Sequence, residues 1–510
     1  MKLNFGIILK CIFYPLFFVV FLWVAIQLFW PDLLVGNKRL DIDQKKGAES
    51  LSVGYFFAPD TLEPTVQMST TRERINNVYE ALVRPDENLK MRSSLALSWG
   101  LLDDYTWQFK LRKGVIFHDG SSFDADDVLA SFERARYWET SEMKDLLAGV
   151  DEVEKVDDFT VNFHTKLPEP LLLQKLSLLL IVPDELVNEA LEKPVGTGPY
   201  QFVNWSGGEQ LMKLKRFDDY WGKRPKFTEV NLLSRFDKSE RVGLLLGGMV
   251  DLLSNVPVDG VATVEDAGFK IATAPTLEVA FLIYNFDSKV LDGVEARKAV
   301  NLALDRDKFV DLLGRFSSPA DQYVSSGVFG YNPRVEAHRY DLEGARELAE
   351  EAGLIGKTVQ FHIPKELGIL GDFLRSNLGK LGVDVLVSFM EVDEYYQNLN
   401  DGVADIYFLG FKSGLGDSGD FFNTVLAEDG EFNFISYENE RAQYLIKSAK
   451  VELDVEKRRD YLQELMAIVT EEDAIGLPMY EGETIYAFNA KIEFQPRLDN
   501  VIYFDEIIVK

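Results

Sequence analysis

The chain has very little cysteine and histidine for its length. Its 510 residues include one cysteine, Cys11, and four histidines, His118, His164, His338 and His362. A single thiol excludes an intrachain disulfide and a thiolate zinc site. The histidines are scattered, without the spacing of metal ligands on one helix or ribbon. We therefore expect no bound metal and no cofactor.

Motifs for catalysis are also missing. His118 and Asp119 are adjacent and could be mistaken for an acid–base pair, but no third group and no nucleophile motif accompany them. The segment Phe117–Gly120 instead predicts a strand end and a turn, with Gly120 at positive φ. Gly196–Tyr200 predicts a second tight turn. We therefore expect no catalytic residues and no enzymatic activity.

Basic side chains are strongly outnumbered. There are 54 Lys and Arg against 83 Asp and Glu, which gives a net charge of −29. Such a surface repels phosphate backbones and anionic lipid headgroups, so nucleic acid is not an expected partner, and solubility is the simplest reason for the charge. A hydrophobic content of 46% excludes a disordered chain. The length predicts two to four domains.

One long hydrophobic run stands at the N-terminus. Cys11–Trp30 contains no charged residue, and at about 1.5 Å per residue a helix of this length spans the roughly 30 Å hydrocarbon core of a bilayer. The run exceeds the ~7–15 apolar residues of a cleavable signal, and no clear cleavage site follows it. We predict a single signal anchor over residues 1–31 and a linker over 32–50. Basic residues on both flanks leave its orientation open.

Hydrophobic periodicity predicts regular elements along the rest of the chain. Asp124 has the character of an N-cap at the start of a helix that runs to Tyr137. Gly314 is placed to end another helix. The predicted strands are Leu51–Phe57, Trp107–Leu111 and Val115–His118, and the predicted helices include Thr71–Leu82, Arg297–Leu304 and Asp307–Leu313.

The stretch after residue 356 alternates strands with helices. We predict strands at Lys357–Ile363, Val383–Phe389 and Asp405–Leu409, separated by helices at Glu366–Leu381 and Val392–Leu399. This βαβαβ pattern implies parallel strands with right-handed crossovers. Ligands of such sheets bind outside the carboxyl ends of the strands.

That rule directs attention to the glycine-rich segment 410–420, which we predict to be a loop. Gly410 permits close backbone approach, Phe411 offers a stacking face, and Lys412 and Asp417 offer charge. A mobile surface loop without function is an equally simple interpretation of any single residue here. As the location of a binding site, this loop is the best candidate in the chain.

Several motifs, in consistent order from Leu51 to the C-terminus, resemble one known family. The chain is similar to the large extracytoplasmic binding proteins of peptide and nickel ABC importers. The FHDG and VGTGPY blocks are together specific, although either alone would be weak. The matching stretches are Ala58–Pro64, Val78–Val83, Ser94–Trp99, Trp107–Arg134, Pro194–Phe202, Phe217–Pro225 and Ala296–Val310.

The resemblance implies an α/β protein with a two-lobed periplasmic-binding-protein-like fold and a third, smaller subdomain, which closes on its ligand by a hinge. Lobe I would comprise residues 51–283, with the inserted subdomain at about 70–190, and lobe II residues 284–480. Residues 481–510 would return to lobe I. The resemblance also places this body outside the cytoplasm.

The resemblance further implies where a ligand binds. Oligopeptide-binding members carry a loop aspartate that pairs with the α-amino group of the peptide. Gly414 stands at that position here, and Asp417 is the nearest carboxylate that could replace it. We expect ligand contacts from Tyr55, Phe57, Asn285, Gly410, Phe411, Lys412, Asp417 and Tyr480.

The sequence therefore predicts a monomeric, membrane-anchored receptor that binds a peptide or another small polar oligomer and passes it to ABC permease subunits. Its body would lie in a periplasm or at the cell surface. Two alternatives stay open at this point. One is a receptor for an oligosaccharide or another non-peptide solute. The other is an anchored sensor or assembly factor with the same fold.

Overall fold

The computed structural model describes residues 50–510 except 192, 208–209 and 431–432. The predicted anchor, Cys11–Trp30, lies outside these residues, as does most of the predicted linker. Within the described part of the chain, no helix is both long and apolar enough to cross a bilayer. Anchoring at the N-terminus therefore stays a prediction from the sequence.

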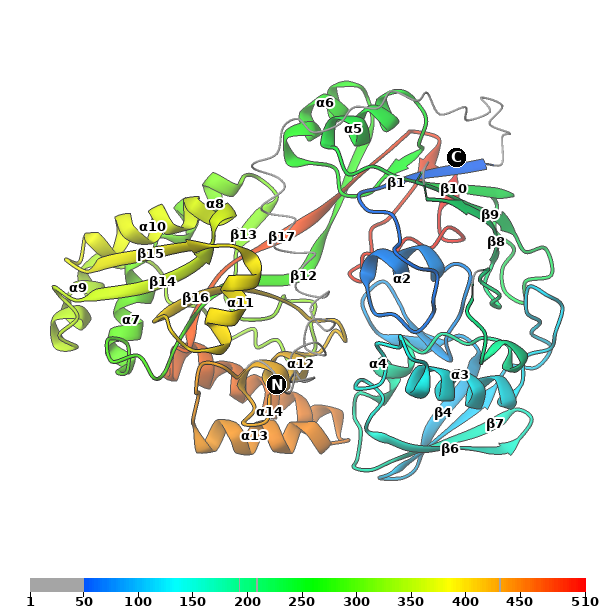
Figure 1. Ribbon diagram of the computed structural model, residues 1–510, viewed down its shortest axis with the longest axis horizontal. Helices are drawn as coiled ribbons and strands as arrows, with labels where there is room; N and C mark the ends of the chain where they lie inside the picture. Colours follow the sequence, from blue (N-terminus) through cyan, green and yellow to red (C-terminus); the bar gives the residue numbers. More distant parts are fainter. Residues whose placement is uncertain (1–49, 192, 208–209, 431–432) are drawn as a thin grey trace, which may run out of the picture. The chain divides into compact units, whose positions relative to one another are not determined.

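The described chain forms two compact units. The terminal unit consists of residues 50–274 with Thr484–Lys510, and the central unit consists of Pro275–Glu483. The chain crosses between them inside two strands, β12 (Lys270–Tyr284) and β17 (Gly476–Phe488), both visible in Figure 1. The lobe limits predicted from the sequence, 283/284 and 480/481, lie nine and three residues from these crossings, at 274/275 and 483/484.

The terminal unit is built around β1 (Ser50–Tyr55), which is buried along almost its whole length. A strand buried on both faces suits the middle of a parallel arrangement. Accordingly, β1 pairs in parallel with β10 (Glu229–Ser234) and with β11 (Leu252–Leu253). Strands β9 (Leu211–Arg216) and β8 (Tyr200–Ser206) extend the sheet antiparallel beyond β10. Helices α5 (Lys238–Leu246) and α6 (Val261–Asp266) follow β10 and β11.

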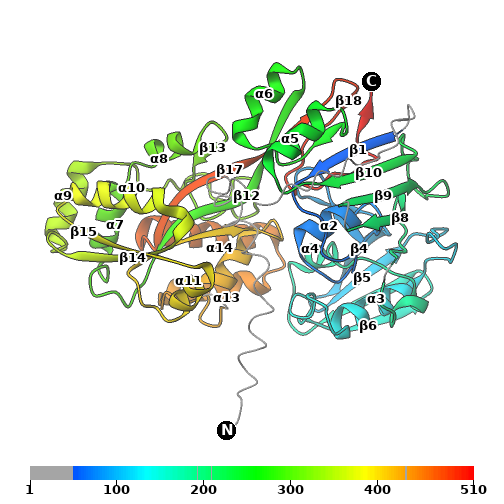
Figure 2. The same cartoon turned by 45° about the horizontal axis from the view of Figure 1, so that its top comes forward.

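A smaller layer with its own hydrophobic core is inserted in the terminal unit. Figures 1 and 2 show helix α3 (Ala125–Tyr137) against its four-stranded antiparallel sheet. The predicted N-cap is confirmed, because the Asp124 carboxylate accepts the Asp126 N–H and Asp127 bonds back to the Asp124 N–H. The strands, in spatial order, are β4 (Ala96–Asp103), β5 (Thr106–Leu111), β7 (Thr160–Thr165) and β6 (Val150–Asp157).

The central unit confirms the predicted βαβαβ pattern. Strand β14 is parallel to both β15 and β16, and the sheet runs in the order β15-β14-β16-β12-β17. Because β15 and β16 lie on either side of β14, the connecting helices α10 and α11 cover opposite faces of the sheet. These elements are β14 (Thr358–Pro364), α10 (Gly368–Gly379), β15 (Asp384–Met390), α11 (Val392–Asn400) and β16 (Ile406–Lys412).

Further helices complete the central unit around the β12 and β17 segments. The two helices predicted after residue 296 are confirmed as α7 and α8, and Gly314 follows α8 at φ 100°. The elements are α7 (Val294–Ala303), α8 (Arg306–Leu313), α9 (Leu342–Glu351), α12 (Ser418–Phe421), α13 (Glu440–Val451), α14 (Val455–Ala467) and the short strand β13 (Ser317–Pro319).

Two predicted elements of the terminal unit are wrong in extent. Helix α2 (Ser69–Ile75) ends well before Leu82, because the Asn77 side chain is bonded to the distant backbone of Ile502 and Phe504. The predicted strand Val115–His118 is reduced to a single bridge. Tertiary hydrogen bonds outweigh the local hydrophobic pattern at both places.

Three of the blocks that carried the family resemblance, Val78–Val83, Pro194–Phe202 and Phe217–Pro225, meet at one buried carboxylate, Glu80. Its oxygens accept hydrogen bonds from the Thr197 hydroxyl at 2.8 Å, the Tyr220 hydroxyl at 3.0 Å and the Trp221 indole at 2.8 Å. The predicted turn at His118 joins them, because its imidazole lies 2.9 Å from the Gly198 carbonyl oxygen. The motifs therefore form one structural junction, as their chemistry suggested.

Glycine is required at this junction by close backbone approach. A Cβ on Gly196 would lie 2.2 Å from the Val78 carbonyl oxygen, and one on Gly198 would lie 2.7 Å from the Asn77 carbonyl oxygen. No real Cβ tolerates such a contact, and the neighbouring atoms are backbone that cannot swing away. Glycine therefore allows the two segments to pack in direct contact.

We expect Gly196→Ala to destabilise the protein by about 3 kcal/mol or more, because the backbone segments must separate. Gly100→Ala is the matched control, since a Cβ there meets nothing within 4 Å, and its effect should stay within about 1 kcal/mol. Chemical denaturation of both variants measures the difference. Equal stability of the two variants would contradict the close packing.

Burial raises the pKa of Glu80 from 4.5 to about 7, despite its three hydrogen-bond donors. A carboxyl whose folded pKa is raised stabilises the fold below its unfolded pKa, and this contribution is lost as pH rises towards 7. The stability of the wild type relative to Glu80→Gln should therefore fall by roughly 2–3 kcal/mol between pH 4 and pH 8. Chemical denaturation of both proteins across this pH range tests the prediction. A difference in unfolding free energy that does not change with pH would contradict it.

Candidate functional site

The central unit presents a recognised type of binding edge where β14 and β16 end. The connection leaving β14 and the one entering β16 lie on opposite faces of the sheet, so the chain direction switches between these neighbouring strands. In open α/β sheets, the carboxyl edge at such a switch is where ligands bind. Here that edge is formed by Pro364 and Lys412 with the residues that follow them.

The structure corrects the predicted loop. Gly410, Phe411 and Lys412 belong to β16, which pairs antiparallel with β12, and the true loop begins at Ser413. Side chains alternate between the two faces of a strand, so Phe411 and Lys412 point to opposite sides of the sheet. The sequence expectation that both contact one ligand from one loop is therefore replaced by two separate surfaces.

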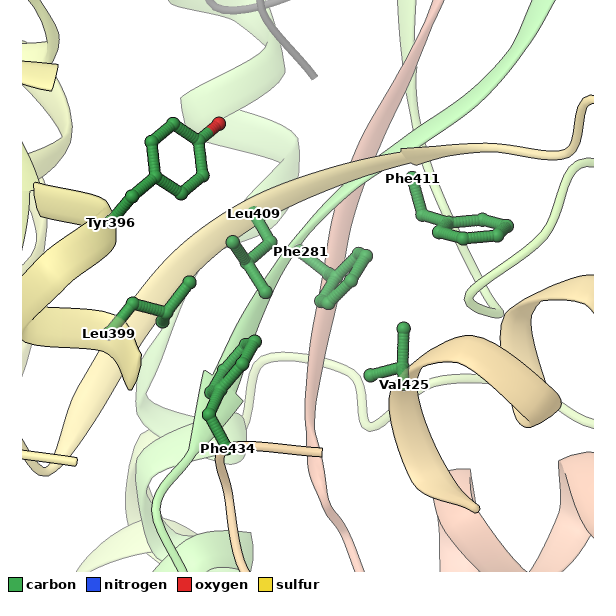
Figure 3. Close-up of a pocket in the computed structure, with 7 residues that line it drawn as sticks. All are labelled: Phe281, Tyr396, Leu399, Leu409, Phe411, Val425 and Phe434. Carbon is green, nitrogen blue, oxygen red and sulfur yellow. The ribbon is translucent and has the colours of Figure 1, made fainter. Parts of the chain in front are cut away.

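Phe411 faces a small apolar pocket, shown in Figure 3. Its own side chain is only 7% exposed, and its ring meets that of Phe421 edge-on at 5.3 Å. Tyr396 and Phe434 are half-buried and are the most accessible of the lining side chains. The remaining lining residues are Phe281, Leu399, Leu409 and Val425. This pocket suits an apolar group and contains no charged side chain.

Lys412 lies on the other face, directly opposite Glu278 of β12. Both side chains are half-buried. Burial raises the pKa of Glu278 to about 7, although the charge of Lys412 opposes this rise. Gly410 stands opposite Ala280 on the same face, so the neighbouring pair contributes almost no side-chain volume.

Tyr480 belongs to this second face as well. Its ring stacks on Phe408 at 6.5 Å and lies 6.0 Å from Phe309 of α8. The side chain is 7% exposed. Burial and the charge of Glu278 both raise the pKa of its hydroxyl, which keeps it protonated at any physiological pH. Tyr480 thus borders the Glu278–Lys412 surface with an aromatic wall.

Asp417 takes part in a buried ion pair, and its role in ligand binding stays a prediction from the sequence. Its carboxylate forms a two-pronged ion pair with Arg458 at 2.6 and 2.8 Å and accepts the Gly419 N–H at the start of α12. The residue is 1% exposed. Releasing this carboxylate for a ligand amine would leave Arg458 buried without its partner, which disfavours Asp417 as a substitute for the aspartate missing at Gly414.

Asn285 is also committed to the fold. Its amide nitrogen donates to the carbonyls of Gly402 and Ala404 at 2.9 and 3.1 Å, and its amide oxygen accepts the Asp287 N–H. Only 4% of the residue is exposed. It fixes the end of β12 against the segment leading into β16, so we assign it to positioning of that strand.

In the terminal unit, Tyr55 and Phe57 have different surroundings. Tyr55 is 1% exposed and its ring is covered by the Arg74 guanidinium at 3.3 Å. Phe57 is half-buried and packs with Phe56 and with Phe236, a residue that is 47% exposed. These rings follow the carboxyl ends of the parallel strands β1 and β10, the edge where α/β sheets hold ligands.

Glu278, Phe56 and Phe236 are candidate site residues that the sequence did not indicate. Glu278 belongs to no recognisable sequence motif, and only the pairing of β12 with β16 brings it opposite Lys412. Phe236 joins Phe57 through the parallel pairing of β1 with β10. Within the described residues, no group of three or more His, Cys, Asp and Glu side chains is arranged to hold a metal ion.

We expect Asp417→Ala to destabilise the protein by about 3–5 kcal/mol, because it leaves a buried arginine unpaired. Asp372→Ala is the control, since it breaks an exposed pair with Arg375 that should contribute less than about 1 kcal/mol. Chemical denaturation distinguishes them. A stable Asp417→Ala variant with impaired ligand binding would instead restore the binding role.

Comparison with known proteins agrees with this geometry. The family model described as "Bacterial extracellular solute-binding proteins, family 5 Middle" matches residues 90–433. The dipeptide-binding protein of Escherichia coli is 26% identical over 421 residues, covering 74% of this chain and 78% of that protein. The glutathione-binding protein of Pectobacterium atrosepticum is 26% identical over 417 residues, covering 77% of this chain and 79% of that protein.

Solved structures show the same fold. The structure of HbpA2 from Haemophilus parasuis superposes with a TM-score of 0.84 at 21% identity, covering 90% of this chain and all of that one. The family match extends over more than half of the chain and includes the small inserted layer, β12 and the βαβαβ region. The chain therefore belongs to the bacterial extracellular solute-binding proteins of family 5, a family of binding proteins of ABC importers.

Proposed function

We propose that this protein is the receptor of an ABC importer for a peptide or a related small polar oligomer, which it binds without chemical change. The observation that carries the proposal is the carboxyl edge of β16. One face of this strand presents the charged Glu278 and Lys412, with the aromatic rings of Phe408 and Tyr480 beside them on the same face. A ligand with charged ends and apolar side chains, such as a short peptide, fits such an edge.

The named ligands of two relatives support this chemical class. One relative is called a dipeptide-binding protein and another a glutathione-binding protein. Both ligands carry ammonium and carboxylate groups on a short peptide chain. The hydrogen-bonding groups of an extended peptide backbone also suit a site beside the end of a strand.

The N-terminal run Cys11–Trp30 supports attachment to the membrane. An uncharged stretch of this length matches the thickness of the hydrocarbon core, so we propose a single uncleaved anchor with the body outside the cytoplasm. The receptor would act as a monomer and deliver its ligand to permease subunits. Tethering would hold the receptor at high local concentration beside the permease.

Closure on the ligand would occur at the two crossings of the chain. Both crossings are single strands, β12 and β17. Hinges of this kind absorb a domain rotation by changes in a few backbone angles. Ligand binding would then shift the receptor between an open and a closed population.

The test is mass spectrometry of the full-length protein, extracted from membranes in detergent without denaturation. We expect co-purifying peptides to be released on denaturation, and we expect the intact mass to include residues 1–31. Isothermal titration with a library of dipeptides and tripeptides should then show saturable binding. Protein without peptide that also gives no titration signal with any member of the library would contradict the proposal.

A second candidate ligand is an oligosaccharide or another non-peptide solute. The aromatic cluster of Phe56, Phe57 and Phe236 in the terminal unit favours it, because flat sugar faces pack well on aromatic rings. Gly414, which has no carboxylate to offer an amine, favours it too. Release of a sugar in the same mass-spectrometric experiment would select this alternative and leave the receptor function intact.

A further inference from the structure

We propose that Glu278 and Lys412 form a two-pole site for a zwitterionic ligand, with Glu278 accepting the ligand's ammonium group and Lys412 its carboxylate. This inference rests on the proposed receptor function and specifies which residues read the charged ends of the ligand. The carboxylate that binds the ligand's ammonium group would then belong to β12 and not to the loop that follows β16.

The first support is position. Glu278 and Lys412 are Cα partners in the antiparallel register of β12 and β16, so their side chains stand next to each other on one face of the sheet. Lys412 is the last residue of β16. The pair therefore stands at the carboxyl edge of the parallel strands, which is the place where ligands of α/β sheets bind.

The second support is that neither charge is neutralised at contact distance. Among the described residues, no ion-pair partner lies within 4 Å of the Glu278 carboxylate or the Lys412 ammonium, and neither group bonds to another side chain. The hydrogen bonds of Glu278 with Thr276 use only the Glu278 backbone. The two side chains interact through space without closing into a salt bridge.

Other charges of the central unit are paired far more closely. Asp417 holds Arg458 through two bonds of 2.6 and 2.8 Å, and the exposed Lys365 contacts Glu391 at the carboxyl ends of β14 and β15. A half-buried carboxylate without such a partner carries a desolvation cost, and this cost raises the pKa of Glu278 to about 7. A ligand ammonium would offset that cost, as paired charges do elsewhere in this unit.

The third support is the surroundings of the pair. The next pair on the same face is Ala280 opposite Gly410, the two smallest side chains in this register. Beyond it, Phe408 carries the stacked ring of Tyr480. Small residues beside two opposite charges leave the backbone approachable, and the aromatic wall suits the short apolar chain between the poles of a zwitterion.

The charge balance selects a zwitterion over a simple amine or acid. An ammonium ligand alone would be attracted by Glu278 but repelled by the neighbouring Lys412, and a carboxylate ligand would meet the reverse. A ligand with both groups satisfies both side chains at once. The arrangement therefore discriminates by charge pattern, because a mismatched ligand leaves one pole buried and unpaired.

The experiment compares the full-length wild type with single variants by titration calorimetry, using three peptide probes. The probes are the dipeptide Ala-Phe, its N-acetyl form and its C-terminal amide. We expect Ala-Phe to bind the wild type at least about tenfold more tightly than either blocked form, as loss of one buried charge partner does at interfaces.

The variants test which side chain binds each charged group of the ligand. Glu278→Gln should weaken Ala-Phe binding by a similar factor but leave N-acetyl-Ala-Phe binding unchanged. Lys412→Met should likewise weaken Ala-Phe binding but leave binding of the C-terminal amide unchanged. Glu391→Gln is the control, because Glu391 follows β15, which is separated from β16 by β14, and all its affinities should equal those of the wild type. Thermal unfolding of each variant verifies that it is folded.

The outcomes separate this inference from the proposed function. The two-pole site is overturned if the wild type binds all three probes tightly, or if Glu278→Gln loses the same affinity for each of them. Neither result contradicts the proposed peptide-binding function. Binding of none of the three by the wild type overturns the two-pole site for dipeptides. If peptides are also absent from the purified protein, the peptide function falls as well.

Discussion

The antiparallel register between β12 and β16 is the constraint on which the candidate site depends. It sets Glu278 opposite Lys412 and Val279 opposite Phe411, and strand alternation then sends the charged pair and the aromatic ring to different faces. A slip of one residue would exchange the two faces and put Lys412 into the apolar pocket. That pocket is lined by Phe281 and Leu409 of the same two strands, so its apolar packing holds the register and, with it, the charges at the strand end.

The family motifs around Glu80 have a different role, which is to stabilise the terminal unit. Glu80 gathers Thr197, Tyr220 and Trp221, and Gly196 lets two backbone segments touch. In the central unit, buried arginines act in the same way: the Arg297 guanidinium donates to the carbonyl oxygens of Leu291, Asp292 and Asp473. Glu80, Thr197 and Arg297 are buried, so they are not accessible to a ligand. The motifs thus identify the fold, and the residues that bind the ligand must lie elsewhere in the chain.

How far the sequence could anticipate the structure follows from the range of the interactions involved. The βαβαβ pattern and the Asp124 cap are local, so periodicity and capping rules predicted them. Asp417 and Asn285 are bonded to other segments of the chain, whereas the Glu278 carboxylate forms no ion pair with the described residues, and no local sequence pattern reveals this difference. The same holds for the Phe57–Phe236 contact, which depends on the parallel pairing of two distant strands. Side-chain chemistry suggested candidate groups, but only tertiary pairing shows which of them are already neutralised.

The central claim is that this receptor holds a zwitterionic solute at the carboxyl edge of β16. A crystal structure of the protein with its co-purified or titrated ligand tests it most directly. The account predicts a ligand ammonium about 3 Å from the Glu278 carboxylate and a ligand carboxylate at a similar distance from the Lys412 ammonium. A ligand whose charged groups contact neither side chain, or one that displaces Arg458 to reach Asp417, would contradict it.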